Sequence, residues 1–183
     1  MRWIRDEQFI RGNIPMTKFE VRISSIAALE IEEGDTLIDI GAGTGSISVE
    51  AALQGAAVYA VEERHEGAEL IRQNSLKFDA SIHVMEGSAP EALFNMPEFN
   101  KCFIGGSGGR LVQIFDWADT SINRGGIIAA NFITLKNLNI FTTLLNDRSY
   151  ADIEIKLLQV SNVDKIGLLK AGNPVFAVRG RKR

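Results

Sequence analysis

A glycine-rich turn at residues 39–45 constrains the fold of this chain more than any other stretch. An apolar pair, Leu37 and Ile38, precedes the turn, a helical pattern follows it from Ser46, and the turn itself is Asp39-Ile40-Gly41-Ala42-Gly43-Thr44-Gly45. Where a strand passes through glycines into a helix, backbone N–H groups and the positive helix end point to one spot. Glycine also lets a ligand approach without meeting a Cβ atom. The stretch predicts a ligand site at the end of a buried strand.

The spacing of the glycines separates two classes of cofactor. Dinucleotide-binding proteins carry G-x-G-x-x-G, in which the third glycine allows the helix to pack closely on the strand. Here the spacing is G-x-G-x-G, and Ser46 stands at the third position. An Asp directly before this tighter loop is the pattern of S-adenosylmethionine (SAM) methyltransferases, which bind no pyrophosphate. A purely structural turn is the alternative, because a glycine motif alone is a weak signal.

Composition predicts an ordinary globular protein. A length of 183 residues with 45% apolar and 23% charged residues fits one domain over 1–183, with residues 1–16 as an N-terminal arm. No apolar run approaches the roughly 20 residues that span a bilayer, and the N-terminus lacks a signal peptide's apolar core. The single Cys102 fits a reducing compartment, so we expect a cytoplasmic protein without membrane contact. His65 and His83 stand apart without metal-ligand spacing, and a net charge of −3 gives no general attraction to nucleic acid.

Apolar periodicity and turn residues predict a regular alternation of elements. The first helix starts at the T-x-x-E pattern of Thr17 and Glu20, which predicts a capping box, and it ends before Gly34. Further helices are expected at 46–54, 65–78, from 111 to 118 and at 134–146. Strands are expected at 36–40, 57–61, 82–85, 101–104, 127–131 after a turn at 124–126, 153–160 and 174–178, with a loop at 161–173 and a charged tail from Arg179.

This alternation predicts an α/β fold with a Rossmann-like, seven-stranded, mostly parallel sheet covered by helices on both faces. Short, nearly all-apolar strands agree, because parallel strands are buried on both sides. The last two strands lack a crossover helix between them, so we expect them to pair antiparallel. A parallel sheet that ends in an antiparallel C-terminal strand is the class I methyltransferase arrangement.

The candidate cofactor residues follow the ends of the first three strands, where an open parallel sheet binds its ligands. Glu62 ends the second strand, where its carboxylate can accept both ribose hydroxyls. The adjacent Glu63 is an alternative, and we favour Glu62 because the apolar strand stops there. Asp39 can orient the glycine loop, take part at the cationic methionine end, or merely cap the turn. After the third strand, Ser88 and Ala89 can run past the adenine or form an ordinary turn before a helix.

A second glycine loop follows the fourth strand and is the candidate substrate site. It comprises Gly105, Gly106, Ser107, Gly108, Gly109 and the adjoining Arg110. Four glycines clear space for a bulky flat substrate and expose several N–H donors, an arrangement that suits carboxylates. A flexible turn at a helix start is the alternative.

Several motifs together resemble one family, and the match extends over nearly the whole chain. They are Pro15-Met16-Thr17-Lys18, the glycine loop 39–45, Glu86-Gly87-Ser88-Ala89-Pro90-Glu91-Ala92-Leu93, Ile104-Gly105-Gly106-Ser107-Gly108-Gly109 and Asn173-Pro174-Val175. In this order and spacing the chain is similar to the precorrin methyltransferases that methylate carbon 15 of the corrin ring and decarboxylate the acetate on carbon 12. The G-G-S-G-G loop is the most discriminating of these motifs.

The resemblance implies an enzyme of the cobalamin pathway that uses SAM as cofactor and a cobalt-precorrin tetrapyrrole as substrate. It also implies a homotetramer, and SAM contacts at Thr17, Gly41 to Gly45, Glu62 and Ala89. Two positions depart from the usual pattern. Ser88 replaces a common Asp, which puts a side-chain bond to adenine in doubt, and Glu62 replaces a frequent Asp, which preserves the ribose contact with a longer reach.

In the expected reaction the protein mainly aligns the carbon nucleophile, the methyl group and the sulfur, because a sulfonium methyl is already electrophilic and the macrocycle supplies the nucleophilic carbon. We expect no metal and no catalytic triad, and no residue stands out as a general acid or base. A substrate rich in carboxylates calls for local positive charge, although each candidate is individually a surface charge by default. The candidates are Arg11, Lys18, Lys136, Lys165 and Arg110, and we favour Arg110 because it adjoins the glycine nest.

Two other functions compete with this interpretation. A SAM-dependent tRNA methyltransferase needs a coherent basic face, and the sequence offers only the tail Arg179-Gly180-Arg181-Lys182-Arg183, which more often serves solubility. A nucleotide-binding or NAD-dependent module without methyl transfer conflicts with the glycine spacing and with the expected terminal antiparallel strands.

Overall fold

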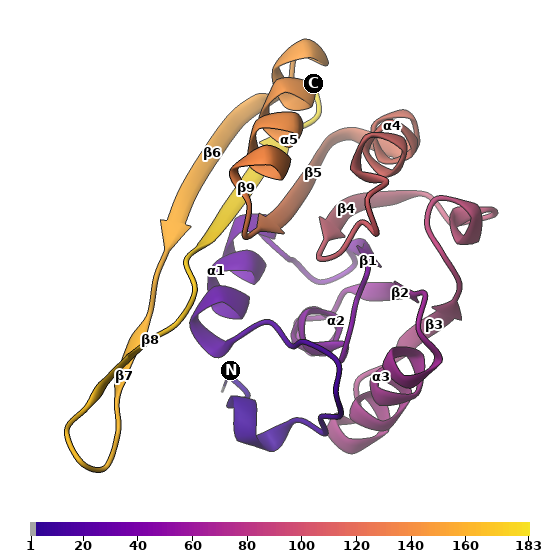
Figure 1. Cartoon of the computed structure of the whole chain (residues 1–183). Helices are drawn as coiled ribbons and strands as arrows, with labels where there is room; N and C mark the ends of the chain where they lie inside the picture. The colour runs from indigo at the N-terminus through magenta and orange to yellow at the C-terminus, as the bar shows by residue number, and fades with distance from the viewer. Residues whose placement is uncertain (1–2) are drawn as a thin grey trace.

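A seven-stranded sheet forms the centre of the computed structural model, which describes residues 3–183 (Figure 1). Its strands are β1 (Thr36–Ile40), β2 (Ala57–Glu62), β3 (Ile82–Glu86), β4 (Phe99–Ile104), β5 (Ile122–Phe132), β6 (Ala151–Leu158) and β9 (Val175–Arg181). Their order is β3-β2-β1-β4-β5-β9-β6. Strands β1 to β5 pair parallel, whereas β9 pairs antiparallel with both β5 and β6. The expected fold class and the antiparallel final strand are confirmed.

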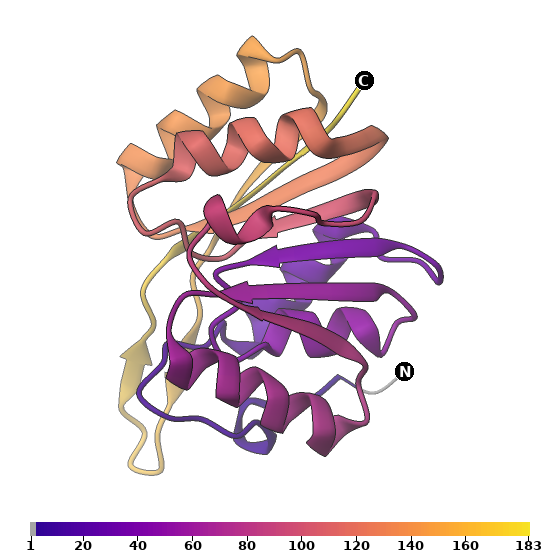
Figure 2. The same cartoon turned by 90° about the vertical axis from the view of Figure 1, so that its right-hand side faces the viewer.

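Helices cover both faces of this sheet (Figure 2). They are α1 (Phe19–Leu29), α2 (Ser46–Ala52), α3 (His65–Phe78), α4 (Leu111–Ser121) and α5 (Leu135–Asp147), with short 3-10 helices at Asp6–Gln8 and Glu91–Leu93. The largest buried apolar cluster lies under α4 and α5, and a second lies under α1 and α2 on the opposite face. Among residues 3–183 no helix is long and apolar enough to cross a membrane.

The strand order reverses between β1 and β4, and this reversal brings the two glycine loops together. The N–H groups of Gly105 and Gly106 donate to the Ile40 carbonyl at 2.9 and 3.3 Å. A Cβ atom on Gly41 would lie 2.6 Å from the backbone of Gly106. Glycine at both positions therefore lets the loops touch at the carboxyl edge, where open α/β sheets place their ligands.

The N-terminus of α1 differs from the prediction. The helix begins at Phe19 with Lys18 as its N-cap residue, and no side chain caps it, so the expected capping box at Thr17 and Glu20 is wrong. The Thr17 carbonyl instead accepts a hydrogen bond from Arg22 Nη1 at 2.9 Å. The T-x-x-E pattern gives no sign of this contact, because it does not include Arg22.

The sheet is longer than predicted at two places. The expected turn at 124–126 lies within β5, where Gly125 has a positive φ of 79° and the register with β4 shifts, as in a β-bulge. The expected solubilising tail is wrong for its first residues, because β9 continues to Arg181. Arg179 is buried and pairs with Glu30 and, at 3.2 Å, with Glu154.

The stretch predicted as a loop at 161–173 is a β-hairpin that projects from the body of the molecule (Figure 1). Its strands are β7 (Ser161–Val163) and β8 (Leu169–Ala171), which pair antiparallel. Asp164 holds the turn, because its Oδ1 accepts from the N–H groups of Ile166 and Leu168, both at 3.0 Å. We refer to residues 161–171 as the hairpin. Short strands of three residues explain why alternation alone did not predict them.

Candidate active site

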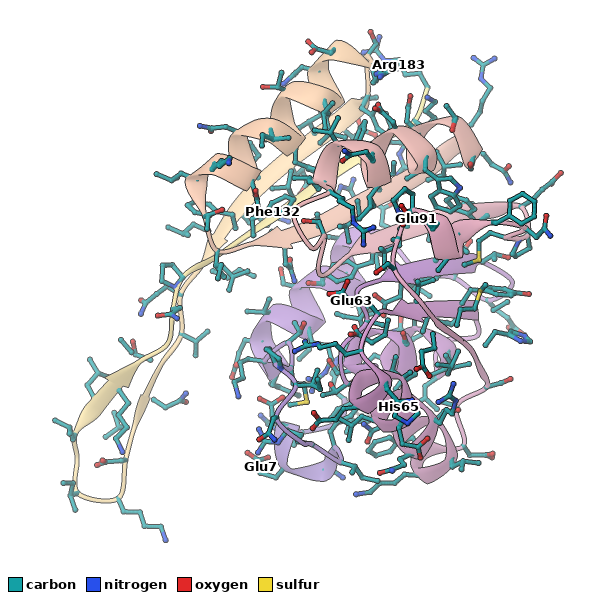
Figure 3. All side chains as sticks on the ribbon, turned by 45° about the vertical axis from the view of Figure 1, so that its right-hand side comes forward. Glu7, Glu63, His65, Glu91, Phe132 and Arg183 are labelled. Atoms are coloured by element: carbon teal, nitrogen blue, oxygen red, sulfur yellow. The ribbon has the colours of Figure 1, made fainter. Side chains whose placement is uncertain are left out.

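A cavity of about 990 Å³ lies at the carboxyl edge of the sheet, beside the two glycine loops. The N-terminal arm and the start of α1 form one wall, and the ends of β5, β6 and β9 with the base of the hairpin form another. Figure 3 shows Glu7 on the arm, Glu63 after β2 and Phe132 at the end of β5, each of which lines this cavity. Its volume suits a cofactor-sized ligand.

The first glycine loop is held in a conformation that needs its glycines. Gly41, Gly43 and Gly45 have φ values of +69°, +60° and +75°, a region that other residues rarely adopt. A Cβ on Gly43 would lie 3.1 Å from the Pro15 carbonyl oxygen, and one on Gly45 would lie 3.1 Å from Ile71. Gly45 thus allows Ile71 of α3 to pack closely against the loop, and Gly43 allows the arm to approach it at Pro15.

Glu62 is the acidic residue that contacts this loop. Its side chain is buried, and its Oε2 accepts from the Gly43 N–H at 2.9 Å. Its Oε1 accepts from the Arg64 N–H at 3.1 Å, and the Arg64 guanidinium lies 3.5 Å away. Each carboxylate oxygen has a second lone pair, so both can still accept from a ligand. Glu63 is half-exposed, and the geometry therefore favours Glu62 as the residue at the end of β2 that meets a ligand.

Asp39 is buried beneath the loop and is only partly satisfied. Its Oδ2 accepts from the Ser48 hydroxyl at 2.5 Å, while its Oδ1 has no partner among residues 3–183. Burial, assisted by the nearby Glu62 charge, raises the pKa of Asp39 to about 7, although the Ser48 hydrogen bond acts in the opposite direction. A buried acceptor without a partner is a place where a donor from a ligand would be stabilised.

The loop after β3 contributes a wall rather than a side-chain contact. Ala89 is buried and lines the cavity together with Gly87, but Ser88 is not among the lining residues. The Ser88 hydroxyl instead donates to Glu63 Oε2 at 3.2 Å, and its carbonyl accepts from the Ala92 N–H at 2.8 Å. The doubt about Ser88 as a direct contact is therefore supported by its geometry.

The second glycine loop offers fewer free donors than predicted. Gly105 and Gly106 already donate to Ile40, so only the N–H groups of residues 107–109 donate no hydrogen bond within residues 3–183. Arg110 is also engaged, because its guanidinium lies 2.8 Å from Glu91 and 3.8 Å from Glu63. The expectation that this loop exposes several free donors is wrong for its first two glycines.

Most of the predicted site residues line the cavity. Those that do are Thr17, Asp39, Gly41, Ala42, Gly43, Glu62, Ala89, Gly105, Gly106, Ser107, Gly108 and Arg110. Those that do not are Thr44, Gly45, Ser88 and Gly109. Of the other predicted cations Lys18 lines both this cavity and a smaller neighbouring hollow, Arg11 lines only the hollow, and Lys136 and Lys165 line neither.

Two sets of lining residues were not predicted. One comes from the arm, where Arg5, Asp6 and Glu7 reach the cavity, and the other from the base of the hairpin, where Asn162 does. The arm packs on the domain through Ile4 and Phe9, which are buried in a small apolar cluster with Val49 and Ala80. Among residues 3–183 no group of three His, Cys, Asp or Glu side chains could hold a metal ion.

Comparisons with known proteins agree with this geometry. Residues 8–180 match the model of the precorrin methyltransferase domain family. The chain is 36% identical to a probable cobalt-precorrin-6B C(15)-methyltransferase (decarboxylating) of Pyrobaculum aerophilum, over 96% of this chain and 93% of that protein. It is also 36% identical to the cobalt-precorrin-6B C(15)-methyltransferase (decarboxylating) of Salmonella typhimurium, over 98% and 96%.

A solved structure has the same fold over nearly its full length. The crystal structure of precorrin-6y C5,15-methyltransferase from Geobacter metallireducens superimposes with a TM-score of 0.93 at 32% identity. The match covers 99% of this chain and 97% of that one. The whole architecture, including the projecting hairpin, therefore lies within the matched length.

Proposed function

The chain belongs to the family of decarboxylating cobalt-precorrin-6B C(15)-methyltransferases, and we propose that its cavity binds SAM beside a cobalt-precorrin. The protein is thus a decarboxylating methyltransferase of corrin synthesis, and the tRNA methyltransferase and NAD-module alternatives are set aside. The single observation that carries the cofactor proposal is the junction of loop 41–45 with the buried Glu62.

The residues at this junction fit the nucleoside of SAM. Glu62 keeps lone pairs for the ribose hydroxyls, and Gly41, Ala42 and Gly43 present backbone at the cavity without bulky side chains. Ala89 lies along the adenine, and Thr17 and Asp39 lie at the methionine end, where the unpartnered Asp39 Oδ1 can accept from the ammonium group. Thr44, Gly45 and Ser88 belong to the same loops but do not line the cavity, so we assign them no direct contact with SAM.

The substrate occupies the side of the cavity that the second glycine loop borders. Gly105 and Gly106 let this loop lie against the first one, so that the two ligands meet. Ser107, Gly108 and Gly109 supply the remaining backbone donors, and Arg110 contributes positive charge that it shares with Glu63 and Glu91. The side chains at the ends of β5 and β6 provide an apolar surface for a flat macrocycle, through Phe132, Ile133 and Leu158.

The chain contributes alignment and exclusion of water rather than acid–base chemistry. SAM, when bound, supplies a methyl group that is already electrophilic. The glycine loops hold the two ligands in contact, and the arm covers them from one side. In the substrate, the electron pair of the broken carbon–carbon bond can enter the conjugated ring as carbon dioxide leaves, and it neutralises the positive charge that the methyl group brings. The methylated carbon then loses its proton and the former acetate carbon gains one, by exchange with solvent, and no protein group is assigned as general acid or base.

A single domain, a cytoplasmic location and a homotetramer complete the proposal. The hairpin supports association, because its apolar side chains are largely exposed: Ile166 by 85%, Val163 by 66% and Leu169 by 63%. Size-exclusion chromatography with light scattering tests the tetramer. A monomer at micromolar concentration would contradict it.

Calorimetry tests the cofactor assignment. SAM is expected to bind and NAD is not, because the loop lacks the geometry for a pyrophosphate. Glu62→Gln, which keeps the size of the side chain but weakens its acceptance of ribose hydroxyls, is expected to reduce SAM affinity about tenfold or more. Glu63→Gln is the matched control. Equal loss in both variants, or binding of NAD instead of SAM, would contradict the assignment.

A further inference from the structure

Two cations of the cavity wall have no acidic partner. Four basic residues line the cavity, and two of them, Arg64 and Arg110, form ion pairs with Glu62, Glu63 or Glu91. Arg5 and Lys18 form no ion pair with any of residues 3–183. Both are exposed, and both belong to the wall that the arm and the start of α1 provide. Their charges are therefore available to a ligand.

One buried side chain brings these two cations to the same wall. Arg22 is fully buried and donates to the carbonyl of Ile4 at 2.5 Å and to the carbonyl of Thr17 at 2.9 Å. These carbonyls directly precede Arg5 and Lys18 in the chain. A single guanidinium thus fixes the backbone ahead of both cations, and Asp6 and Glu50 balance its charge at 3.0 and 3.4 Å.

The Arg5 side chain is also fixed in direction. Its guanidinium carbon lies 4.1 Å from the centre of the Phe19 ring, the distance of a cation–π contact. A guanidinium that contacts an aromatic ring in this way can still offer its N–H groups to a planar acceptor. Because Phe19 directly follows Lys18 in the chain, the Arg5 guanidinium lies against the residue next to Lys18.

Acidic neighbours reduce the general attraction of this wall for anions. Glu7 and Glu20 line the same wall, and neither pairs with Arg5 or Lys18 within residues 3–183. The wall therefore has no large net charge that would draw any anion. An anionic group is stabilised there only where it contacts the two cations directly, which favours carboxylates held at a fixed position.

We propose that Arg5 and Lys18 form a carboxylate-binding pair for a ligand of this cavity. The inference rests on the proposed function, which supplies two sources of carboxylate: the side chains of the tetrapyrrole and the methionine end of SAM. Prediction of substrate contacts from the sequence favoured Arg110, but Arg110 is already paired with two glutamates. The arm therefore contributes charge to recognition that the glycine nest does not.

Three probes separate the sources. SAM carries the methionine carboxylate, 5′-methylthioadenosine lacks it, and uroporphyrin carries a carboxylate on every side chain. Their affinities are measured by calorimetry or fluorescence for the full chain and for Arg5→Gln, Lys18→Gln and the double variant. Arg11→Gln is the control, because Arg11 is a cation on the same arm that lies outside the main cavity.

The double variant is expected to bind its carboxylate ligand at least about tenfold more weakly, with no loss in the control. Loss for uroporphyrin alone assigns the pair to the substrate, and loss for SAM but not for 5′-methylthioadenosine assigns it to the cofactor. Unchanged affinity for both carboxylate probes overturns the pair alone. Failure of the wild-type chain to bind either SAM or uroporphyrin overturns the proposed function and the pair together.

Discussion

The arm and the hairpin border the same cavity but are held in different ways. The arm is fixed inside the protein by Arg22, whose side chain is fully buried and binds two backbone carbonyls and two carboxylates. The hairpin has no buried residue, and its apolar side chains face outward (Figure 3). One wall is therefore positioned by buried contacts within the chain, whereas the hairpin has no such contacts and leaves apolar surface uncovered.

The largest expected effect is the release of the arm. Arg22→Met keeps the bulk of the side chain but leaves Asp6 and Glu50 without their partner, and a broken buried ion pair costs about 3–5 kcal/mol. Urea unfolding measures this loss. Arg72→Met, at a surface arginine with ion pairs to Glu69 and Glu86, is the control and is expected to cost about 1 kcal/mol or less. Equal losses would show that the arm is not specially fixed.

Asp39, which lies on the floor between the two walls, gives a prediction about pH. Because its folded pKa is raised from 3.8 to about 7, the folded protein keeps a proton that the unfolded chain releases, and stability falls as pH rises from about 4 to about 7. Asp39→Asn removes this penalty, so the variant is expected to be more stable than wild type at pH 8 by up to about 4 kcal/mol. The difference should vanish near pH 4. Urea unfolding at both pH values checks it, and a constant difference would refute the assignment.

The contact between the arm and the first glycine loop gives the next effect. Gly43→Val places a side chain against the Pro15 carbonyl at a φ of +60° and is expected to abolish SAM binding, by about a hundredfold or more in affinity. Gly34→Val is the matched control, because Gly34 also has a positive φ of 89° but no atom lies within 4 Å of its added Cβ. Unchanged SAM affinity in Gly43→Val would place the pocket elsewhere.

The smallest effect on folding is expected in the hairpin. Ile166→Ser with Leu169→Ser removes exposed apolar surface and should change the free energy of unfolding of the isolated chain by about 0.5 kcal/mol or less. The same double variant is expected to weaken self-association, which light scattering measures. A large loss of stability without any change of mass would mean that the hairpin is fixed within the chain, as the arm is.

The difference between the two walls also explains what the sequence could predict. Local patterns were sufficient for the glycine loop 41–45, for Glu62 at the end of β2 and for the antiparallel β9, because strand ends and glycine turns have their own signatures. They failed where side-chain contacts decide that no apolar or turn pattern encodes. At the start of α1, Arg22 binds the Thr17 carbonyl five residues before it, and the burial of Arg179 depends on Glu30, which is far away in the sequence.

The candidate site shows the same limit. The glycines of loop 105–109 predicted a loop at the cavity. They did not predict that the N–H groups of Gly105 and Gly106 donate to the Ile40 carbonyl and are therefore not free for a ligand. Arg110 adjoins that loop in sequence and was favoured for substrate binding, yet Glu63 and Glu91 reach it from other loops. No sequence pattern marked Arg5 as a site residue, because Arg5 reaches the cavity only through the path that the arm takes in the folded structure.

Product analysis tests the central claim most directly. The full chain is incubated with SAM and cobalt-precorrin-6B, and the product is weighed by mass spectrometry. We expect the gain of one methyl group together with the loss of one carbon dioxide, and neither change when SAM is omitted. Methyl gain without loss of carbon dioxide, or loss of carbon dioxide that does not require SAM, would contradict the account.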